Sequence, residues 1–85
     1  MVGTATRIGR SPDSDIVLPD LSISRHHAVI IDNGRTLVIV EVGSANGVSV
    51  RGQRISPEAE LSEGDRIEIG IYEFTFETNP RGRPE

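Results

Sequence analysis

The stretch "AVIIDNGRTLVIVEV", residues 28 to 42, joins two apolar runs through a polar reversal. Valine and isoleucine fit the pleated, half-buried surface of a β-sheet. The segment Asp32-Asn33-Gly34 between the runs is typical of a hairpin turn, because Asn and Gly accept positive φ. The sequence therefore predicts two antiparallel strands, Ala28–Ile31 and Leu37–Val42, joined by a tight connection.

The rest of the chain repeats this rhythm. Short runs rich in Val and Ile recur at intervals of about eight to twelve residues, and no segment has helical periodicity. Arg51-Gly52 predicts a second tight reversal, and the alternation in 72–77 predicts that Tyr72, Phe74 and Phe76 share one buried face. We therefore expect an all-β fold, a small antiparallel β-sandwich. Besides the central hairpin, its expected strands are Thr6–Gly9, Ile16–Leu18, Val48–Val50, Arg66–Ile69 and Tyr72–Glu77, with a short piece at Arg54–Ile55.

Composition excludes several classes of function. The 85 residues contain no cysteine, so disulfides and thiol chemistry are excluded, as suits a reducing cytoplasmic or other intracellular setting. No apolar run reaches the ~18 residues of a membrane span, and no secretory leader is visible. The net charge of −4 opposes binding to nucleic acid. Pro80, Gly82 and Pro84 make residues 78–85 a predicted flexible tail or linker after a domain of residues 1–77.

The stretch "LSISRHHAVI", residues 21 to 30, suggests three kinds of chemistry. A catalytic reading of Ser24 and His27 lacks a visible orienting carboxylate and oxyanion donors, so we expect no enzyme. Neighbouring side chains on a strand point to opposite faces, so His26 and His27 cannot both bind one metal ion, and we expect no metal and no cofactor. The turn after Gly9 lacks the spacing of a nucleotide-binding phosphate loop. The remaining interpretation is a site that binds an anion.

Three separated loops carry polar groups suited to an anion or a peptide backbone. Arg10 follows a predicted strand, Ser24-Arg25 precedes another, and residues 44–47 (Ser-Ala-Asn-Gly) join two more. Loops at one end of a sandwich can converge. The sequence therefore predicts a socket at that end.

The ordered segments "RIGRSPDSDIVLPDLSISRHHAVI", "VGSANGVSVRGQRI" and "LSEGDRIEIGIYEFTF" together resemble the forkhead-associated (FHA) domain family, from about Arg7 to Glu77. The resemblance rests on the Gly-Arg pair, the Ser-x-x-His pair, the Asn-Gly pair and the later Glu-Gly-Asp-Arg-Ile turn. It implies a β-sandwich whose loops at one end bind a phosphothreonine peptide. The implied function is a non-catalytic module in Ser/Thr kinase signalling or phospho-dependent assembly, whose partner is the kinase or its substrate.

The resemblance implies a role for individual residues. Arg10 resembles the arginine that contacts phosphate, and its planar fork suits charge-assisted bonds to two phosphate oxygens. Ser24 resembles a hydroxyl donor to the same phosphate, and Arg25 follows where members often place another contact. Asn46 resembles the asparagine whose amide bonds the peptide main chain. Ser44, in the same loop, is also expected at the phosphopeptide.

Other residues resemble the scaffold of the site. His27 would brace neighbouring loops by hydrogen bonds, and Gly9 would let the chain turn tightly before Arg10. Gly47 belongs to the same supporting set. His26 is expected to be exposed and idle, on the opposite side of its strand from His27.

Two departures from the family pattern support a second reading. Ala45 stands where the family often has a threonine beside the phosphate, which removes one contact. The chain also starts a few residues before the Gly-Arg strand, where members usually have one or two more strands, so the sandwich is expected to be incomplete on one edge. The alternative function is an FHA-fold domain that docks an unphosphorylated partner or self-associates through that edge.

Overall fold

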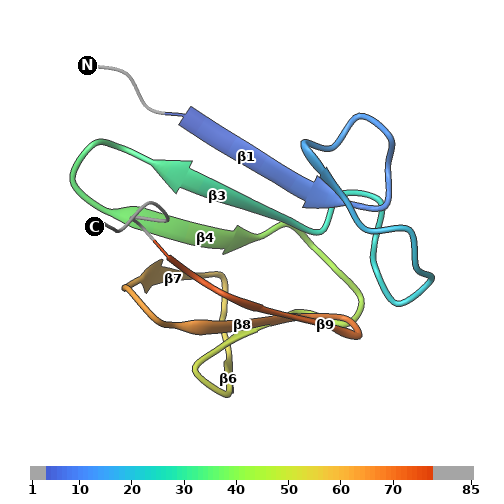
Figure 1. The fold of residues 1–85 in the computed structure, drawn as a ribbon. Helices are drawn as coiled ribbons and strands as arrows, with labels where there is room; N and C mark the ends of the chain where they lie inside the picture. Colours follow the sequence, from blue (N-terminus) through green and yellow to red (C-terminus); the bar gives the residue numbers. More distant parts are fainter. Residues whose placement is uncertain (1–3, 78–85) are drawn as a thin grey trace, which may run out of the picture.

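A computed structural model of the chain describes residues 4–77, which form nine strands and no helix (Figure 1). One sheet has the strand order β2-β1-β3-β4-β7, and the other has the order β6-β5-β8-β9. The all-β sandwich predicted from the sequence is confirmed. The strands are β1 Thr4–Gly9, β2 Ile16–Val17, β3 Ala28–Asp32, β4 Leu37–Glu41, β5 Val48–Val50, β6 Gln53–Arg54, β7 Glu58–Leu61, β8 Arg66–Ile69 and β9 Tyr72–Thr75.

The hairpin predicted from residues 28–42 lies in the middle of the first sheet. β3 pairs antiparallel with β4, from Ala28 opposite Glu41 to Asp32 opposite Leu37. The connection is longer than a two-residue turn, because the Asn33 side-chain oxygen accepts the backbone N–H groups of both Arg35 and Thr36 at 2.9 Å. In contrast, Arg51-Gly52 forms the predicted two-residue reversal between β5 and β6, with both residues at positive φ.

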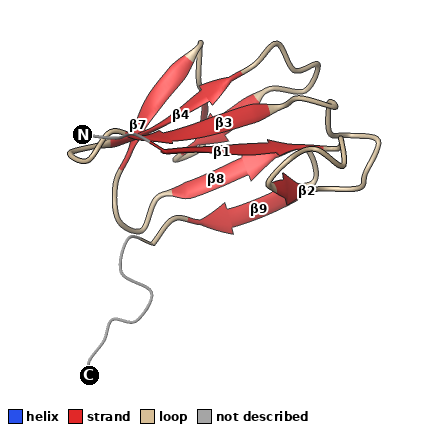
Figure 2. Ribbon diagram, turned by 90° about the horizontal axis from the view of Figure 1, so that it is seen from above, coloured by secondary structure: helices blue, strands red, loops and turns tan. Residues whose placement is uncertain are grey.

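The two sheets enclose one apolar core. Figure 2 shows β4, β3 and β1 of the first sheet side by side. Ile39 of the first sheet and Val48 and Ile69 of the second are fully buried, as is Ile23 from the loop before β3. The core is aliphatic because the inward positions of the strands carry Ile, Val and Leu. Among residues 4–77, the buried polar residues are Ser11, His27, Ser44 and Asp65. The first three lie in the three loops that carry the predicted site.

Two features of the sheets differ from the sequence prediction. β7 was not predicted, since Glu58-Ala-Glu-Leu61 contains residues that are depleted in strands. It forms because it pairs with β4 and buries Leu61 opposite Leu37. β2 was predicted, but it pairs with β1 in parallel rather than antiparallel, with Ile8 opposite Ile16. The loop of residues 10–15 returns the chain to the edge of β1, which makes this direction possible.

The aromatic face of β9 is less buried than the alternating pattern predicts. Tyr72 and Phe76 pack against the core, but Phe74 is 36% exposed. The prediction was wrong for Phe74 because β9 lies at the edge of its sheet, where only one neighbouring strand covers it. The predicted tail, residues 78–85, lies outside the described residues, so the boundary at residue 77 stays a prediction. Within residues 4–77, no helix has the length and hydrophobicity needed to cross a membrane.

Candidate functional site

The three loops that the sequence singled out lie at one end of the sandwich (Figure 1). They follow β1, precede β3 and join β4 to β5. The turn between β8 and β9 joins them, because the Ile71 N–H donates to Ser22 Oγ at 3.2 Å. The structure thus brings residues together that are separated by as many as 49 positions in the sequence.

Arg10 lies at the end of β1 and is held against the loop before β3. Its backbone N–H donates to the Ser24 carbonyl at 3.0 Å, and its side-chain Nε donates to the Ile23 carbonyl, also at 3.0 Å. These two bonds fix the backbone and the inner side of the guanidinium. Its two terminal nitrogens have no partner among residues 4–77, so they are available to a ligand.

Gly9 supports this arrangement by close approach rather than by a tight turn. Its φ is not in the left-handed region, unlike that of six other glycines among residues 4–77. A Cβ at position 9 would overlap the carbonyl oxygen of Arg25 and lie 2.9 Å from its carbonyl carbon. The Ser11 N–H donates to the same Arg25 carbonyl at 3.2 Å. The absence of a side chain at Gly9 therefore lets the two loops lie in contact.

His27 is fully buried, with 0% of its surface exposed, and it bridges two loops. Its Nδ1 accepts the Ser24 N–H at 3.0 Å, and its Nε2 lies 2.8 Å from the Gly47 carbonyl oxygen. Because Nδ1 accepts a backbone proton, the ring hydrogen must be on Nε2, which donates to Gly47. The bracing hydrogen bonds expected of His27 are present. His26 beside it is exposed, as expected, although both histidines precede β3 and do not lie on it.

Ser24 connects the loop before β3 to the loop after β4. Its Oγ accepts the Ala45 N–H at 3.1 Å. A hydroxyl has one proton to donate, and none of the hydrogen bonds of residues 4–77 uses that of Ser24 as a donor. The Ser24 hydroxyl hydrogen therefore has no acceptor among the described residues.

Asn46 lies on the exposed side of its loop. Its Nδ2 donates to the Ser22 carbonyl at 2.7 Å, which orients the side-chain amide. The Oδ1 atom and the second Nδ2 hydrogen are then open to solvent, so one acceptor and one donor face outward together. That pair matches the two groups of a peptide bond. Ser22 was not predicted to support the site, although it holds both Asn46 and Ile71.

Ser44 differs from the other predicted contact residues because it is buried, with 8% of its surface exposed. Its Oγ accepts the Gly47 N–H at 2.9 Å and donates to a Glu41 carboxylate oxygen at 3.2 Å. The structure thus places the Ser44 hydroxyl inside the loop, away from its exposed face. Arg25 is exposed, and its side chain has no salt bridge with a described carboxylate.

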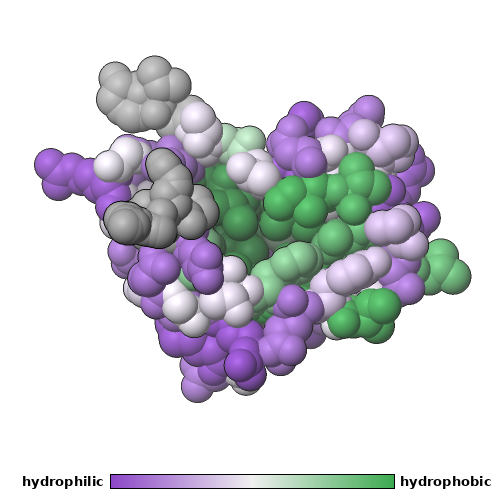
Figure 3. All heavy atoms as spheres, viewed as in Figure 1, coloured by the Kyte–Doolittle hydropathy of each residue, from purple (hydrophilic) through white to green (hydrophobic). Residues whose placement is uncertain are grey.

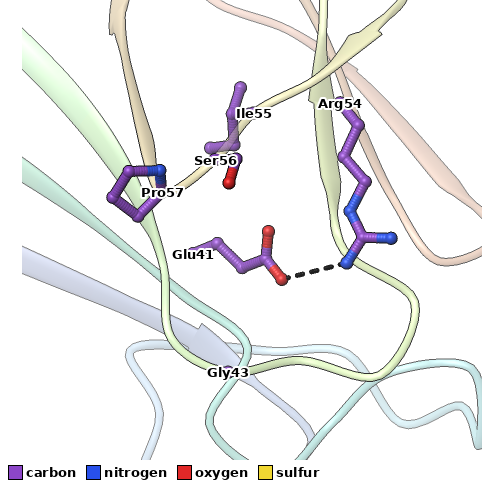
Figure 4. A pocket seen from close by; sticks show the side chains of 6 residues that line it. All are labelled: Glu41, Gly43, Arg54, Ile55, Ser56 and Pro57. Carbon is purple, nitrogen blue, oxygen red and sulfur yellow. Dashed lines mark hydrogen bonds and ion pairs between the residues drawn. The ribbon is translucent and has the colours of Figure 1, made fainter.

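Arg54 supports the same loop through Glu41, and it was not predicted to do so. Its Nη2 donates to Glu41 Oε2 at 3.2 Å (Figure 4). The same oxygen accepts the Ser44 hydroxyl hydrogen. Gly47 has a φ of 77°, and a Cβ there would overlap the Arg54 guanidinium. The sequence carries no signal for this contact, because β6 and the 44–47 loop meet only through folding.

The arginines differ in whether they form salt bridges. Arg7, Arg51, Arg54 and Arg66 pair with carboxylates, whereas Arg10 and Arg25 do not among the residues described. Two acids close to the site accept hydrogen bonds from the protein itself. Hydrogen bonds from Arg7 hold the pKa of Asp15 below its usual value, and hydrogen bonds from Ser22 do the same for the pKa of Asp20.

Within residues 4–77, no group of three or more His, Asp or Glu side chains is placed to hold a metal ion. The loops at this end instead carry two arginines, a serine hydroxyl and an asparagine amide. These groups donate hydrogen bonds or carry positive charge, and the combination suits an anionic group next to a peptide chain.

The fold and the loop site together define a small β-sandwich of the kind that binds a ligand with its loops. Residues 6–70 match the FHA domain family, and the chain belongs to that family. The resemblance seen in the sequence is confirmed.

Two curated relatives illustrate the match. The transcriptional regulatory protein EmbR of Mycobacterium tuberculosis (strain ATCC 25618 / H37Rv) is 52% identical over 73 residues, which are 86% of this chain and 19% of EmbR. The glycogen accumulation regulator GarA of Mycolicibacterium smegmatis is 41% identical over 76 residues, which are 89% of this chain and 48% of GarA. The chain thus spans less than half the length of either relative.

Solved structures give the same result. The structure of Mycobacterium tuberculosis EmbR in complex with a low affinity phosphopeptide has a TM-score of 0.85 and 52% identity, over 86% of this chain and 19% of that one. A structure from a study of phosphothreonine-dependent FHA domain interactions has a TM-score of 0.84 and 29% identity, over 92% of this chain and 80% of that one.

Proposed function

We propose that this domain binds phosphothreonine peptides at its loop end, without catalysis, and so responds to a Ser/Thr kinase inside the cell. The observation that carries the proposal is that hydrogen bonds join the three loops that carry Arg10, Ser24 and Asn46. Arg10 and Arg25 of these loops have no carboxylate partner among residues 4–77. The phosphopeptide complex of EmbR, a relative 52% identical to this chain, supports it.

Each residue has a distinct role in the proposal. The terminal nitrogens of Arg10 and the hydroxyl of Ser24 bind phosphate oxygens, and Arg25 adds charge beside them. Asn46 binds the peptide main chain with its free oxygen and hydrogen. Ser44 acts through the loop: its hydroxyl holds Gly47 and Glu41, and it does not touch the ligand.

Ala45 makes the socket simpler than that of many relatives. Its backbone N–H is bound to Ser24, and its methyl group offers nothing to a phosphate. The loss of the threonine hydroxyl costs about 1 kcal/mol of binding free energy, because water can hydrogen-bond the phosphate in its place. Phosphate binding therefore persists in the proposal, with a weaker affinity.

The proposal is tested with one peptide in three forms, selected from a degenerate library fixed at phosphothreonine. Its phosphothreonine, phosphoserine and unmodified threonine forms are titrated into the domain by calorimetry. We expect the phosphothreonine form to bind and the unmodified form to fail.

Two variants locate the binding to the loop end. Arg10→Ala and Ser24→Ala should each weaken affinity for the phosphothreonine peptide by about tenfold or more, since hydrogen bonds to charged groups contribute roughly 1.5–3 kcal/mol. Arg35→Ala is the matched control, because Arg35 is exposed in the β3–β4 turn at the other end of the sandwich (Figure 1). Equal effects of Arg10→Ala and Arg35→Ala would show that only general charge matters.

The second candidate function is docking of an unphosphorylated partner. Its supporting observation is the missing hydroxyl at Ala45. Equal affinity for the phosphorylated and unmodified peptides, unchanged in Arg10→Ala, would favour it over phosphothreonine recognition.

A further inference from the structure

The outer edge of β9 carries no strand among residues 4–77. β9 is the last strand of its sheet and pairs only with β8, from Ile69 opposite Tyr72 to Arg66 opposite Thr75. A sheet edge presents backbone N–H and C=O groups that can pair with a strand from another chain. The edge of β9 is four residues long, twice the length of β2 or β6.

Two observations show which residues of β9 direct their backbone groups outward. The Phe76 N–H donates to the Asp65 carbonyl, and the Phe76 carbonyl accepts the Gly64 N–H, each at 2.8 Å. Both backbone groups of Phe76 thus point toward the β8 side. The Arg66 carbonyl accepts Arg51 N–H on the β5 side, so the pair Arg66 and Thr75 is not hydrogen-bonded. Because successive residues alternate, Glu73 and Thr75 present their N–H and C=O groups to the free edge.

The same edge opens onto apolar surface. A groove of about 240 Å³ lies between the two sheets here, lined by residues such as Ile8, Ile16, Phe74 and Phe76. Phe74 at its rim is 36% exposed. Figure 3 shows apolar surface exposed between the two sheets, on the face seen in Figure 1.

We propose that β9 pairs antiparallel with β9 of a second copy of this chain, centred on Phe74. In this register Glu73 lies opposite the second copy's Thr75, and Thr75 lies opposite its Glu73. Both are outward-directed residues, so each pair exchanges two hydrogen bonds. The two Phe74 side chains then form the close, non-hydrogen-bonded pair between them and cover apolar surface at the groove.

Charge selects this register and this edge. If one β9 strand slides by two residues along the other, Glu73 lies opposite Glu73 of the second copy in one direction. In the other direction Glu73 lies opposite the second copy's Glu77. Like charges directly opposite each other destabilise a strand pair. The edge strand β7 of the other sheet carries Glu58 and Glu60, so antiparallel self-pairing centred on Ala59 places Glu58 opposite Glu60 twice. Of the two four-residue edge strands, β9 can therefore pair with itself without placing glutamates opposite each other.

The first experiment measures the dissociation constant of the dimer by sedimentation equilibrium of the full chain over a range of concentrations. We expect reversible dimers of wild type at micromolar to submillimolar concentration. A chain that remains monomeric throughout this range overturns the proposal. So does a monomer whose β9 edge binds only a strand peptide of different sequence, because the occupant is then another protein.

Two substitutions at one position test the register. Thr75→Glu places like charges opposite Glu73 twice in the dimer, and Thr75→Lys places opposite charges there twice. By the usual size of cross-strand pair effects, Thr75→Glu should weaken the dimer by about twofold to thirtyfold, and Thr75→Lys should tighten it over a similar range. Dimers that respond equally to both changes, or to neither, overturn the proposed edge.

Glu60→Gln is the matched control, because it changes the net charge by the same amount as Thr75→Lys but at β7 on the other sheet. Its dimer should have the wild-type dissociation constant. Titration of the phosphothreonine peptide into Thr75→Glu separates this proposal from the proposed function. Peptide binding is expected to be unchanged there, because Thr75 makes none of the site's hydrogen bonds.

Discussion

At the scale of single residues, the imidazole of His27 does the most to hold the loop end together. One ring nitrogen accepts from the loop before β3, and the other donates to the loop after β4. Both partners are main-chain groups, so the bridge depends on the imidazole and on the tautomer that their geometry imposes. A neutral ring with its hydrogen on Nε2 satisfies both.

Replacing His27 by alanine should lower the stability of the fold, with weaker peptide binding as a consequence. The change leaves the Ser24 N–H and the Gly47 carbonyl without partners, at about 1–3 kcal/mol each. Chemical denaturation should show a loss of about 2–6 kcal/mol in the free energy of unfolding. His26→Ala is the control, since the exposed neighbour should cost less than about 0.5 kcal/mol. A His27→Ala variant with native stability that no longer binds would contradict the bracing role.

The sequence was informative about residue types and less so about their orientation. Arg10, Ser24 and Asn46 were predicted at the loop end, and the structure places them there. The inward orientation of Ser44 could not be predicted, because it depends on Glu41 and Arg54 in neighbouring strands. Gly9 was predicted to be needed for a turn, but contact with the Arg25 carbonyl requires it.

At the scale of elements, alternation and turn chemistry located eight of the nine strands. β7, the strand that was not predicted, has weak β-strand propensity and is stabilised by pairing with β4. The parallel pairing of β2 also depends on tertiary context, since no local pattern in two residues encodes direction. The sequence thus predicted the strands whose own side chains favour them, and not the features that depend on neighbours.

The loop between β4 and β5 and the strand β6 should behave as one energetic unit. Gly47→Ala places a Cβ against the Arg54 guanidinium and also a non-glycine residue at positive φ, which costs about 1–2 kcal/mol on its own. In an Arg54→Ala background the collision is absent. A double-mutant cycle on unfolding free energy should therefore show a coupling of about 0.5–3 kcal/mol.

Gly43→Ala provides the comparison for this cycle. Gly43 has a φ of 66°, and a Cβ added there would meet no atom within 4 Å, so only the backbone cost applies. It should add to Arg54→Ala without coupling. Additive behaviour of Gly47→Ala with Arg54→Ala would mean that the guanidinium does not restrict position 47.

At the scale of the whole molecule, the net charge is −4, and the proposed ligand is also negative. Between pH 7.5 and 5.5 ordinary carboxylates and arginines keep their charge, whereas the second ionisation of phosphothreonine lies near pH 6. Affinity for the phosphothreonine peptide should therefore fall on acidification, by up to about fourfold if only the dianion binds.

The pH series is measured by calorimetry in wild type and in His26→Ala. The two profiles should coincide, because His26 is exposed and makes no hydrogen bond to the site residues within the described chain. If affinity instead rises at low pH and the rise disappears in His26→Ala, then His26 contacts the phosphate.

The hydrogen bonds between the loops have a kinetic consequence. Ser24 with Ala45, Asn46 with Ser22, and His27 with Gly47 tie together segments that would otherwise move independently. Their ordering entropy is lost when the chain folds, so a peptide meets a surface that is already shaped. Peptides should then reach this end of the sandwich at similar rates, and a preferred sequence differs from a poor one mainly in how long it stays.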